Sequence, residues 1–126
     1  MNKTNALRKI IQTNINQIVT SYYRKADKDK NKIFPHAVYD FENIDLGDIN
    51  RDDLILVIDL WDHGEDTTQI EDLADAIETI FNAANMPDEE VLPTFYRISR
   101  KPIDDEDKMI MHRQLKFQVQ NYYIGG

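Results

Sequence analysis

The pattern of apolar and polar positions has its most apolar run at residues 53–62, which is also rich in branched side chains. In a strand, successive side chains point to opposite faces of the sheet. The run is too short to span a membrane, which takes about 20 apolar residues. We therefore predict a central strand with one wholly apolar face covered by a helix, and an opposite face that takes either a second cover or a neighbouring subunit. The first face carries Leu54, Leu56, Ile58 and Leu60, and the second carries Asp53, Ile55, Val57, Asp59 and Trp61.

Two helices are predicted from apolar residues at three- and four-residue spacing. The first covers residues 4–23. The second begins at the capping-box sequence 68–71, in which the Glu71 side chain would reach back to the Thr68 amide, and it ends near Ala84. This second helix is the natural cover for the apolar face of the central strand. Its own apolar face consists of Ile70, Leu73, Ala74, Ile77, Ile80 and Phe81.

Three further strands are predicted from period-two patterns at residues 36–44, 94–100 and about 109–123. The first of these would pair with the central strand as an antiparallel hairpin. The order helix-strand-strand-helix-strand-strand favours a single α+β domain over residues 1–126, with an antiparallel or mixed four-stranded sheet and two main helices. Residues 24–34 are expected to be a flexible basic loop. The last strand would point Met109, Met111, Leu115, Phe117 and Val119 inward, although Arg113 interrupts this series.

Composition and charge narrow the classes of function. The chain has 126 residues, a net charge of −8 and no cysteine, which excludes disulfides, thiol catalysis and cysteine-based zinc sites. Residues 1–34 hold eight lysines and arginines against two aspartates, whereas the remainder holds seven basic and 21 acidic residues. Overall acidity disfavours nucleic-acid binding, which relies on Lys and Arg at phosphates. The uneven charge fits either a solvated basic surface or a contact between the basic front of one copy and the acidic body of another.

Two acidic segments are the candidates for chemistry. The turn Asp62-His63-Gly64-Glu65-Asp66 gathers carboxylates and an imidazole after a strand, but it matches no known metal-binding loop, and acids before a helix are favoured on electrostatic grounds alone. The tip Asp104 to Asp107 fits either a solvated hairpin end or a site for a cation or basic partner. The three histidines are far apart in sequence, and no phosphate loop or nucleophile elbow is present. We predict no catalytic residue, cofactor or metal site.

Three blocks of sequence, 53–62, 93–97 and 113–120, together with the acidic turn and helix that follow the first block, resemble small proteins from the head–tail region of tailed phages and prophages of Gram-positive bacteria. The chain is most similar to the tail terminator, or tail completion, family. The resemblance covers the pattern of elements over most of residues 1–123. It implies an α+β subunit without catalytic residues. It also implies a ring, commonly of six copies, that stops growth of the tail tube and offers a surface to the connector of the head.

We therefore expect a non-enzymatic structural protein of the virion tail, assembled in the bacterial cytoplasm. Its expected partners are further copies of itself, the tail tube protein and the head connector or head-completion protein, and no membrane or specific nucleic-acid sequence. One alternative is a head-completion or head–tail joining protein. Two others are a small metal-dependent hydrolase using Asp62, His63, Glu65 and Asp66, and a monomeric module that binds a peptide along a free sheet edge. The expected interface residues are Arg24, Lys25, Lys28, Lys30, Lys32, Ile55, Val57, Asp59, Trp61, Asp104, Asp105, Glu106 and Asp107.

Overall fold

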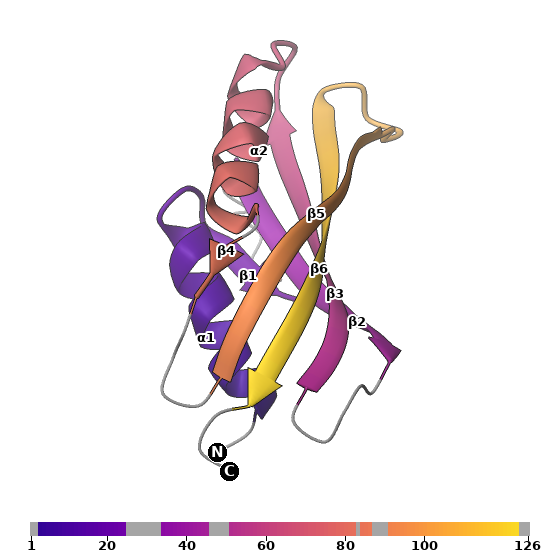
Figure 1. The fold of residues 1–126 in the computed structure, drawn as a ribbon. Coiled ribbons are helices and arrows are strands. Elements are labelled where there is room, and N and C mark those ends of the chain that lie inside the picture. The colour runs from indigo at the N-terminus through magenta and orange to yellow at the C-terminus, as the bar shows by residue number, and fades with distance from the viewer. Residues whose placement is uncertain (1–2, 25–33, 46–50, 83, 87–90, 124–126) are drawn as a thin grey trace.

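The computed structural model describes residues 3–24, 34–45, 51–82, 84–86 and 91–123. They form two helices and a six-stranded sheet with the strand order β1-β2-β3-β6-β5-β4 (Figure 1). In chain order the elements are α1 (Lys3–Asn16), β1 (Ser21–Tyr23), β2 (His36–Asp45), β3 (Arg51–His63), α2 (Thr68–Phe81), β4 (Ala84–Asn85), β5 (Val91–Ile103) and β6 (Ile110–Tyr123).

The sheet is built from two long hairpins. β2 pairs with β3 and β5 pairs with β6, both antiparallel, and the antiparallel pairing of β3 with β6 joins the two hairpins. Only β1 runs parallel to its neighbour, β2. The prediction of an α+β fold with a mixed sheet is therefore confirmed at this level, and so is the central position of the strand at residues 53–62, which lies within β3.

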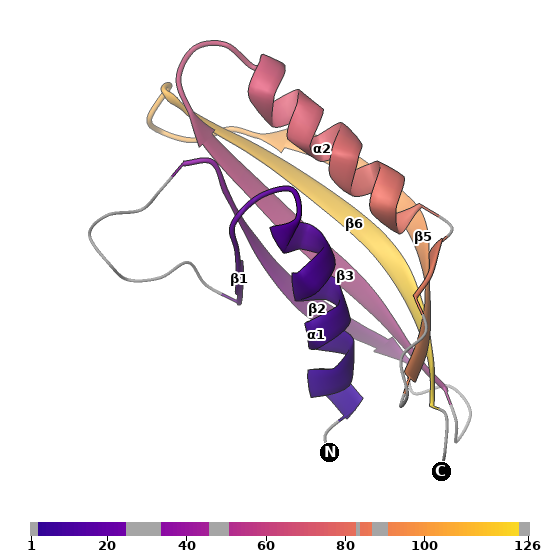
Figure 2. The same cartoon turned by 90° about the vertical axis from the view of Figure 1, so that its left-hand side faces the viewer.

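Both helices lie on the same face of the sheet (Figure 2). One cluster of buried side chains joins α1, α2 and the inner face of the sheet. The prediction that Leu54, Leu56, Ile58 and Leu60 form the covered face is confirmed, because the last three are fully buried in this cluster and the partly buried Leu54 packs against it. We call the opposite side of the sheet the uncovered face, because neither helix packs on it. The helices contribute Leu7, Ile11, Ile15, Ile70, Ala74, Ile77 and Phe81 to the cluster.

The predicted number of strands and the predicted helix ends were wrong. The structure has two additional strands, β1 and β4, of three and two residues, which are too short to show an alternating pattern. α1 ends at Asn16 instead of residue 23, because the amides of Ile18 and Val19 both donate to the Ile15 carbonyl. The Asn16 side chain then accepts hydrogen bonds from the backbone amide and hydroxyl of Ser21, at 3.1 and 2.7 Å, and thereby fixes the turn into β1. α2 likewise ends at Phe81, before Ala84.

The predicted capping box at α2 is replaced by another arrangement. Asp66 Oδ1 accepts hydrogen bonds from the Thr68 amide at 2.9 Å and the Thr68 hydroxyl at 2.7 Å. These two bonds lower the pKa of the Asp66 carboxyl below its usual value. Glu71 instead turns toward the sheet. Asp66 takes the role that the sequence pattern assigned to Glu71, because two arginines on the sheet compete for the Glu71 carboxylate.

Those arginines bind α2 to the inner face of the sheet. Arg113 Nε donates to Glu71 Oε1 at 2.6 Å, which explains why a charged residue interrupts the apolar series of β6. Arg100 on β5 lies 2.6 Å from Asp75, 3.0 Å from Glu71 and 3.2 Å from Glu78. Burial lowers the pKa of the Arg100 guanidinium, but its hydrogen bonds to Asp75 and Glu78 outweigh burial and hold the pKa above its ordinary value.

Both margins of the sheet are poor templates for a further strand. β1 pairs with β2 only at residues 37–39, and β4 pairs with β5 only at residues 94–95. Along the rest of β5, the register slips between Arg97 and Ser99, and the exposed Lys101 and Pro102 follow. Bulges, charges and prolines at an edge discourage strand pairing between molecules.

Candidate functional site: the uncovered sheet face

The strand register defines which side chains share the uncovered face. Trp61 of β3 lies directly between His36 of β2 and His112 of β6. Two residues further along β3, Asp59 lies between Val38 and Gln114 in the same way. Val38 and Val57 are only 9% and 8% exposed, because neighbouring side chains on this face cover them. The more exposed apolar residues of β5 and β6 are Tyr96, Ile98 and Tyr122.

A row of planar side chains crosses this face at right angles to the strands. The rings of Trp61 and His112 stack with centroids 4.3 Å apart and planes 23° apart. On the other side of the indole, the His36 ring stacks at 5.4 Å and 20°. Tyr22 of β1 meets His36 edge-on at 6.2 Å. We call these four residues, Tyr22, His36, Trp61 and His112, the aromatic row.

The third histidine of the chain lies beside the row. Phe34 is 5.1 Å from the His36 ring and 5.9 Å from the His63 ring, measured between centroids. All three histidines are therefore gathered at one end of the uncovered face, although they are far apart in sequence. Their separation along the chain therefore did not reveal that they come together in the fold. Only the pairing register places residues 36, 63 and 112 together, and a single sequence does not reveal that register.

One carboxylate orients the row. Asp59 Oδ1 lies 2.7 Å from His112 Nε2 and accepts a hydrogen bond from the Gln114 side-chain amide at 3.2 Å. The His112 and Asp59 side chains are 13% and 22% exposed. A half-buried carboxylate between two donors fixes the imidazole against Trp61. The arrangement has stacking surface and few charges, which is typical of a docking surface, because Trp and other aromatic residues are enriched at the centres of protein interfaces.

Of the predicted basic and acidic interface residues, the structure describes Arg24 and Asp104 to Asp107, which lie toward opposite margins of the sheet. Arg24 is exposed after β1, at one margin of the sheet, where it lies 3.4 Å from Asp40. Lys25, Lys28, Lys30 and Lys32 lie outside the described residues. The connection between β5 and β6 holds Asp104 to Asp107 and lies toward the margin of the sheet opposite β1.

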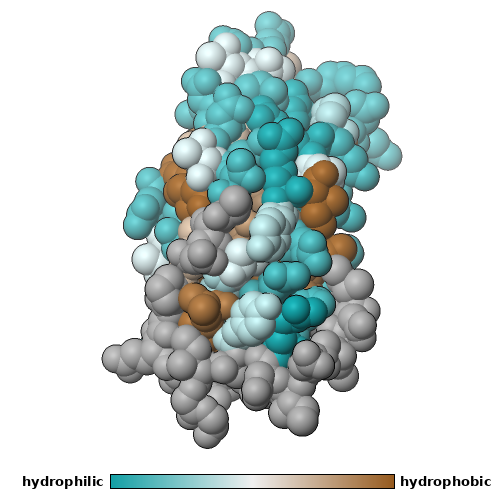
Figure 3. Space-filling view, viewed as in Figure 1, coloured by the Kyte–Doolittle hydropathy of each residue, from teal (hydrophilic) through white to brown (hydrophobic). Residues whose placement is uncertain are grey.

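The acidic tip at residues 104–107 is packed against a second acidic turn. The Gly64 amide donates to the Met109 carbonyl at 2.8 Å and so ties the turn between β3 and α2 to the base of the hairpin. Gly64 has a φ of +136°, a conformation that explains the glycine at this position. Met109 itself is 37% exposed in the turn before β6, so its predicted inward orientation was wrong. Hydrophilic residues dominate this end of the molecule (Figure 3).

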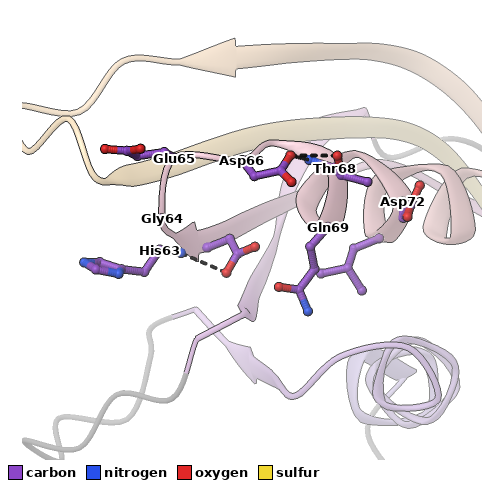
Figure 4. A pocket seen from close by; sticks show the side chains of 9 residues that line it. His63, Gly64, Glu65, Asp66, Thr68, Gln69 and Asp72 are labelled. Carbon is purple, nitrogen blue, oxygen red and sulfur yellow. Dashed lines mark hydrogen bonds between the residues drawn. The ribbon is translucent and has the colours of Figure 1, made fainter.

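A pocket lies beneath the turn between β3 and α2 (Figure 4). The buried Asp62 carboxylate accepts a hydrogen bond from the His63 amide at 2.8 Å. The Asp66 carboxylate already accepts hydrogen bonds from the amide and hydroxyl of Thr68. His63 and Glu65 point away from Asp72 in Figure 4. Among the described residues, no three His, Cys, Asp or Glu side chains are placed to hold a metal ion. The hydrolase alternative therefore has no metal-ligand set in this part of the chain.

No model of a known protein family matches this chain, and a search of curated proteins finds no match. Within the described residues, no helix is long and apolar enough to cross a membrane.

Proposed function

We propose that this chain is a non-enzymatic assembly protein whose uncovered face is covered by a neighbouring copy in a ring. The observation that carries the proposal is the placement of both helices on one side of the sheet. It leaves the aromatic row, Ile55 and Val57 without a cover from either helix. The sequence pattern left open whether the N-terminal helix crosses this face, but α1 packs on the inner face instead.

The charge distribution supports contact between unlike surfaces of neighbouring copies. A closed ring with head-to-tail contacts needs two different patches on each subunit. Arg8 and Arg24 lie together near one margin of the sheet, where the Arg8 guanidinium stacks 4.0 Å and the Arg24 guanidinium 5.0 Å from the Tyr23 ring. The acidic tip at residues 104–107 lies toward the opposite margin of the sheet, between β5 and β6. Opposite charges on separate surfaces favour association of copies in one orientation.

The resemblance noted in the sequence supplies the biological setting of the proposal. A ring of this kind, with six copies as is common in that family, would cap the end of a phage tail tube and present a surface to the head connector. The acidity of the chain supports this setting, because a ring through which DNA passes should not hold phosphate. The second candidate is a head-completion protein of the same assembly, which differs in the surface it docks on.

Two measurements test the proposal. Sedimentation or light scattering should show an oligomer that grows with protein concentration, and Ile55→Lys on the uncovered face should abolish it. Thr79→Lys, on the exposed side of α2, is the matched control and should leave the mass unchanged. Electron microscopy with purified tail tubes should show added density at one tube end. A monomer at every concentration, with no density on tubes, would overturn the proposal, and density only on heads would favour the second candidate.

A further inference from the structure

We propose that the acidic tip at residues 104–107 of one copy docks in a hollow beside α1 of the next copy. This inference rests on the proposed function and names two surfaces that would meet in the ring. The hollow has a volume of about 540 Å³ and lies on the solvent side of α1. We call it the α1 hollow. The side chains that line it are Asn5, Arg8, Lys9, Gln12 and Thr13.

The α1 hollow is positively charged. None of its lining residues is acidic, and α1 as a whole contains neither aspartate nor glutamate. Within the residues that the structure describes, neither Arg8 nor Lys9 forms an ion pair with a carboxylate. Two cations without such a partner, in a chain of net charge −8, make this hollow a favourable place for an anion.

Arg8 is held in place before any partner arrives. Its guanidinium lies 4.0 Å from the centre of the Tyr23 ring, and its Nη1 donates to the side-chain oxygen of Asn5 at 3.4 Å. Arg24 contacts the same ring, but it already lies 3.4 Å from the Asp40 carboxylate. A guanidinium that is fixed on a ring loses little freedom when it meets a carboxylate, and its planar fork can bind both oxygens. Arg8 is therefore the anchor of the hollow.

The acidic tip offers two carboxylates to such an anchor. Asp105 Oδ1 accepts a hydrogen bond from the Asp107 amide at 2.9 Å, and Asp107 Oδ1 accepts one from the Met109 amide at 2.9 Å. These two side chains therefore shape the turn. Asp104 and Glu106 are exposed, and neither forms a hydrogen bond or an ion pair with another described side chain. They are the carboxylates that can bind Arg8 and Lys9 of another copy.

The tip and the α1 hollow are too far apart to meet within one molecule. The tip connects β5 and β6 at the top of Figures 1 and 2, whereas α1 lies toward the bottom of both views. The proposed contact therefore joins two copies. It uses a different surface on each copy, which is the head-to-tail arrangement that a closed ring requires. Opposite charges at such a contact also select the orientation in which the copies approach.

The experiment reverses the charge on each side of the contact. Dissociation constants of wild type, Arg8→Glu and Glu106→Lys are measured by sedimentation at low and at high salt. Each reversal replaces an attraction by a repulsion, so each should weaken association about tenfold or more at low salt. The difference should shrink at high salt, because salt screens exposed charges. If circular dichroism shows that Arg8→Glu is unfolded, Lys9→Glu, at an exposed position of the same hollow, replaces it throughout.

A charge swap distinguishes a direct contact from an effect of net charge. The double variant Arg8→Glu/Glu106→Lys keeps the net charge at −8 and restores opposite charges on the two surfaces. It should associate within about threefold of wild type, since the two changes compensate each other only if the side chains meet. Arg8→Glu/Asp72→Lys is the matched control. It has the same net charge but reverses an exposed acid of α2 instead of the tip, so it should remain as weak as Arg8→Glu.

The outcomes distinguish this inference from the proposed function. A wild type that does not associate, alone or with tail tubes, would contradict the proposed function and this inference together. A wild type that associates, while either single reversal leaves its affinity unchanged, would overturn only the docking of the tip in the α1 hollow. A charge swap that associates no more tightly than the Asp72 control would also overturn it.

Discussion

Arg113 Nε donates to Glu71 Oε1 at 2.6 Å, and this bond crosses from the inner face of β6 to the first turn of α2. The Glu71 carboxylate also accepts a hydrogen bond from the Arg100 guanidinium at 3.0 Å. Arg100 extends these charged contacts along α2 to Asp75 and Glu78, whereas Ile70, Ala74, Ile77 and Phe81 hold the same helix by apolar packing. The two kinds of contact make different predictions for stability.

Replacing Arg100 by alanine should lower the free energy of unfolding by about 1–3 kcal/mol, because its hydrogen bonds to three carboxylates are lost, although Glu71 keeps Arg113 as a donor. The side chain is 20% exposed, and Glu78 retains Arg97 at 3.0 Å, so screening and this second partner keep the loss below that of a fully buried pair. Urea unfolding measures the difference. Lys101→Ala, one residue along and exposed, should change stability by less than about 0.5 kcal/mol. Equal losses in both variants would show that the arginine contacts contribute nothing specific.

Asp66→Ala should destabilise α2 in a way that depends on pH. The pKa of Asp66 is lowered in the folded state by its hydrogen bonds from Thr68, so the charged form favours folding. This contribution is present above the unfolded pKa, about 3.9, and is lost as the pH falls through the lower folded value. Thermal unfolding should show a lower Tm for Asp66→Ala at pH 7, and the gap should narrow below about pH 4. Thr68→Val, which removes one of the two bonds, should give an intermediate shift. A gap that stays constant with pH would contradict this assignment.

Tyr39→Phe should cost about 1 kcal/mol of stability, because the fully buried hydroxyl donates to Gln12 Oε1 at 2.6 Å. Burial raises the pKa of the Tyr39 phenol, so its contribution is complete below the ordinary value of about 10 and is lost as the pH rises through the higher folded value. The difference between wild type and Tyr39→Phe should therefore shrink in strongly alkaline solution. Denaturant unfolding at neutral and alkaline pH provides the measurement. Tyr96→Phe, at an exposed position, is the control and should have no measurable effect.

The two faces of β3 should respond differently to truncation. Ile58→Ala removes a fully buried side chain from the core and should cost about 2–5 kcal/mol. Ile55→Ala, on the uncovered face, should cost about 1 kcal/mol in dilute protein, while weakening self-association. Unfolding at low concentration and sedimentation at high concentration separate the two effects. If Ile55→Ala unfolds the dilute protein as severely as Ile58→Ala, the uncovered face is part of the core.

The apolar run at residues 53–62 was sufficient to predict the central strand, and its even positions were sufficient to predict the covered face, because Leu56, Ile58 and Leu60 are all fully buried. The same rule could not predict β1 and β4, since two or three residues carry no period. It also treated Arg113 as an interruption, because the pattern does not reveal that Glu71 lies across from it. Contacts of this kind depend on how α2 is placed on the sheet, which local sequence does not specify.

The candidate site was predicted only in part. Ile55, Val57, Asp59 and Trp61 were expected on the second face, and the register places them there. The two histidines that stack on Trp61 were missed. Their clearest sequence signal is position: His36 begins β2, and His112 lies at an outward position of β6, so each could have been aligned with Trp61 by assuming antiparallel pairing. That alignment requires the registers of the β2–β3 and β3–β6 pairings, which a single sequence does not reveal.

The slip at Arg97–Ser99 and the short strands at the margins have a consequence for how large an assembly can become. Proteins that add strand to strand extend without limit, as fibrils do. Here β1 and β4 are too short to guide another backbone, and the bulge, Lys101 and Pro102 of β5 discourage further pairing. For a subunit whose proposed task is to end a polymer, such edges are a safeguard, because they disfavour growth by added strands from the molecule that halts growth.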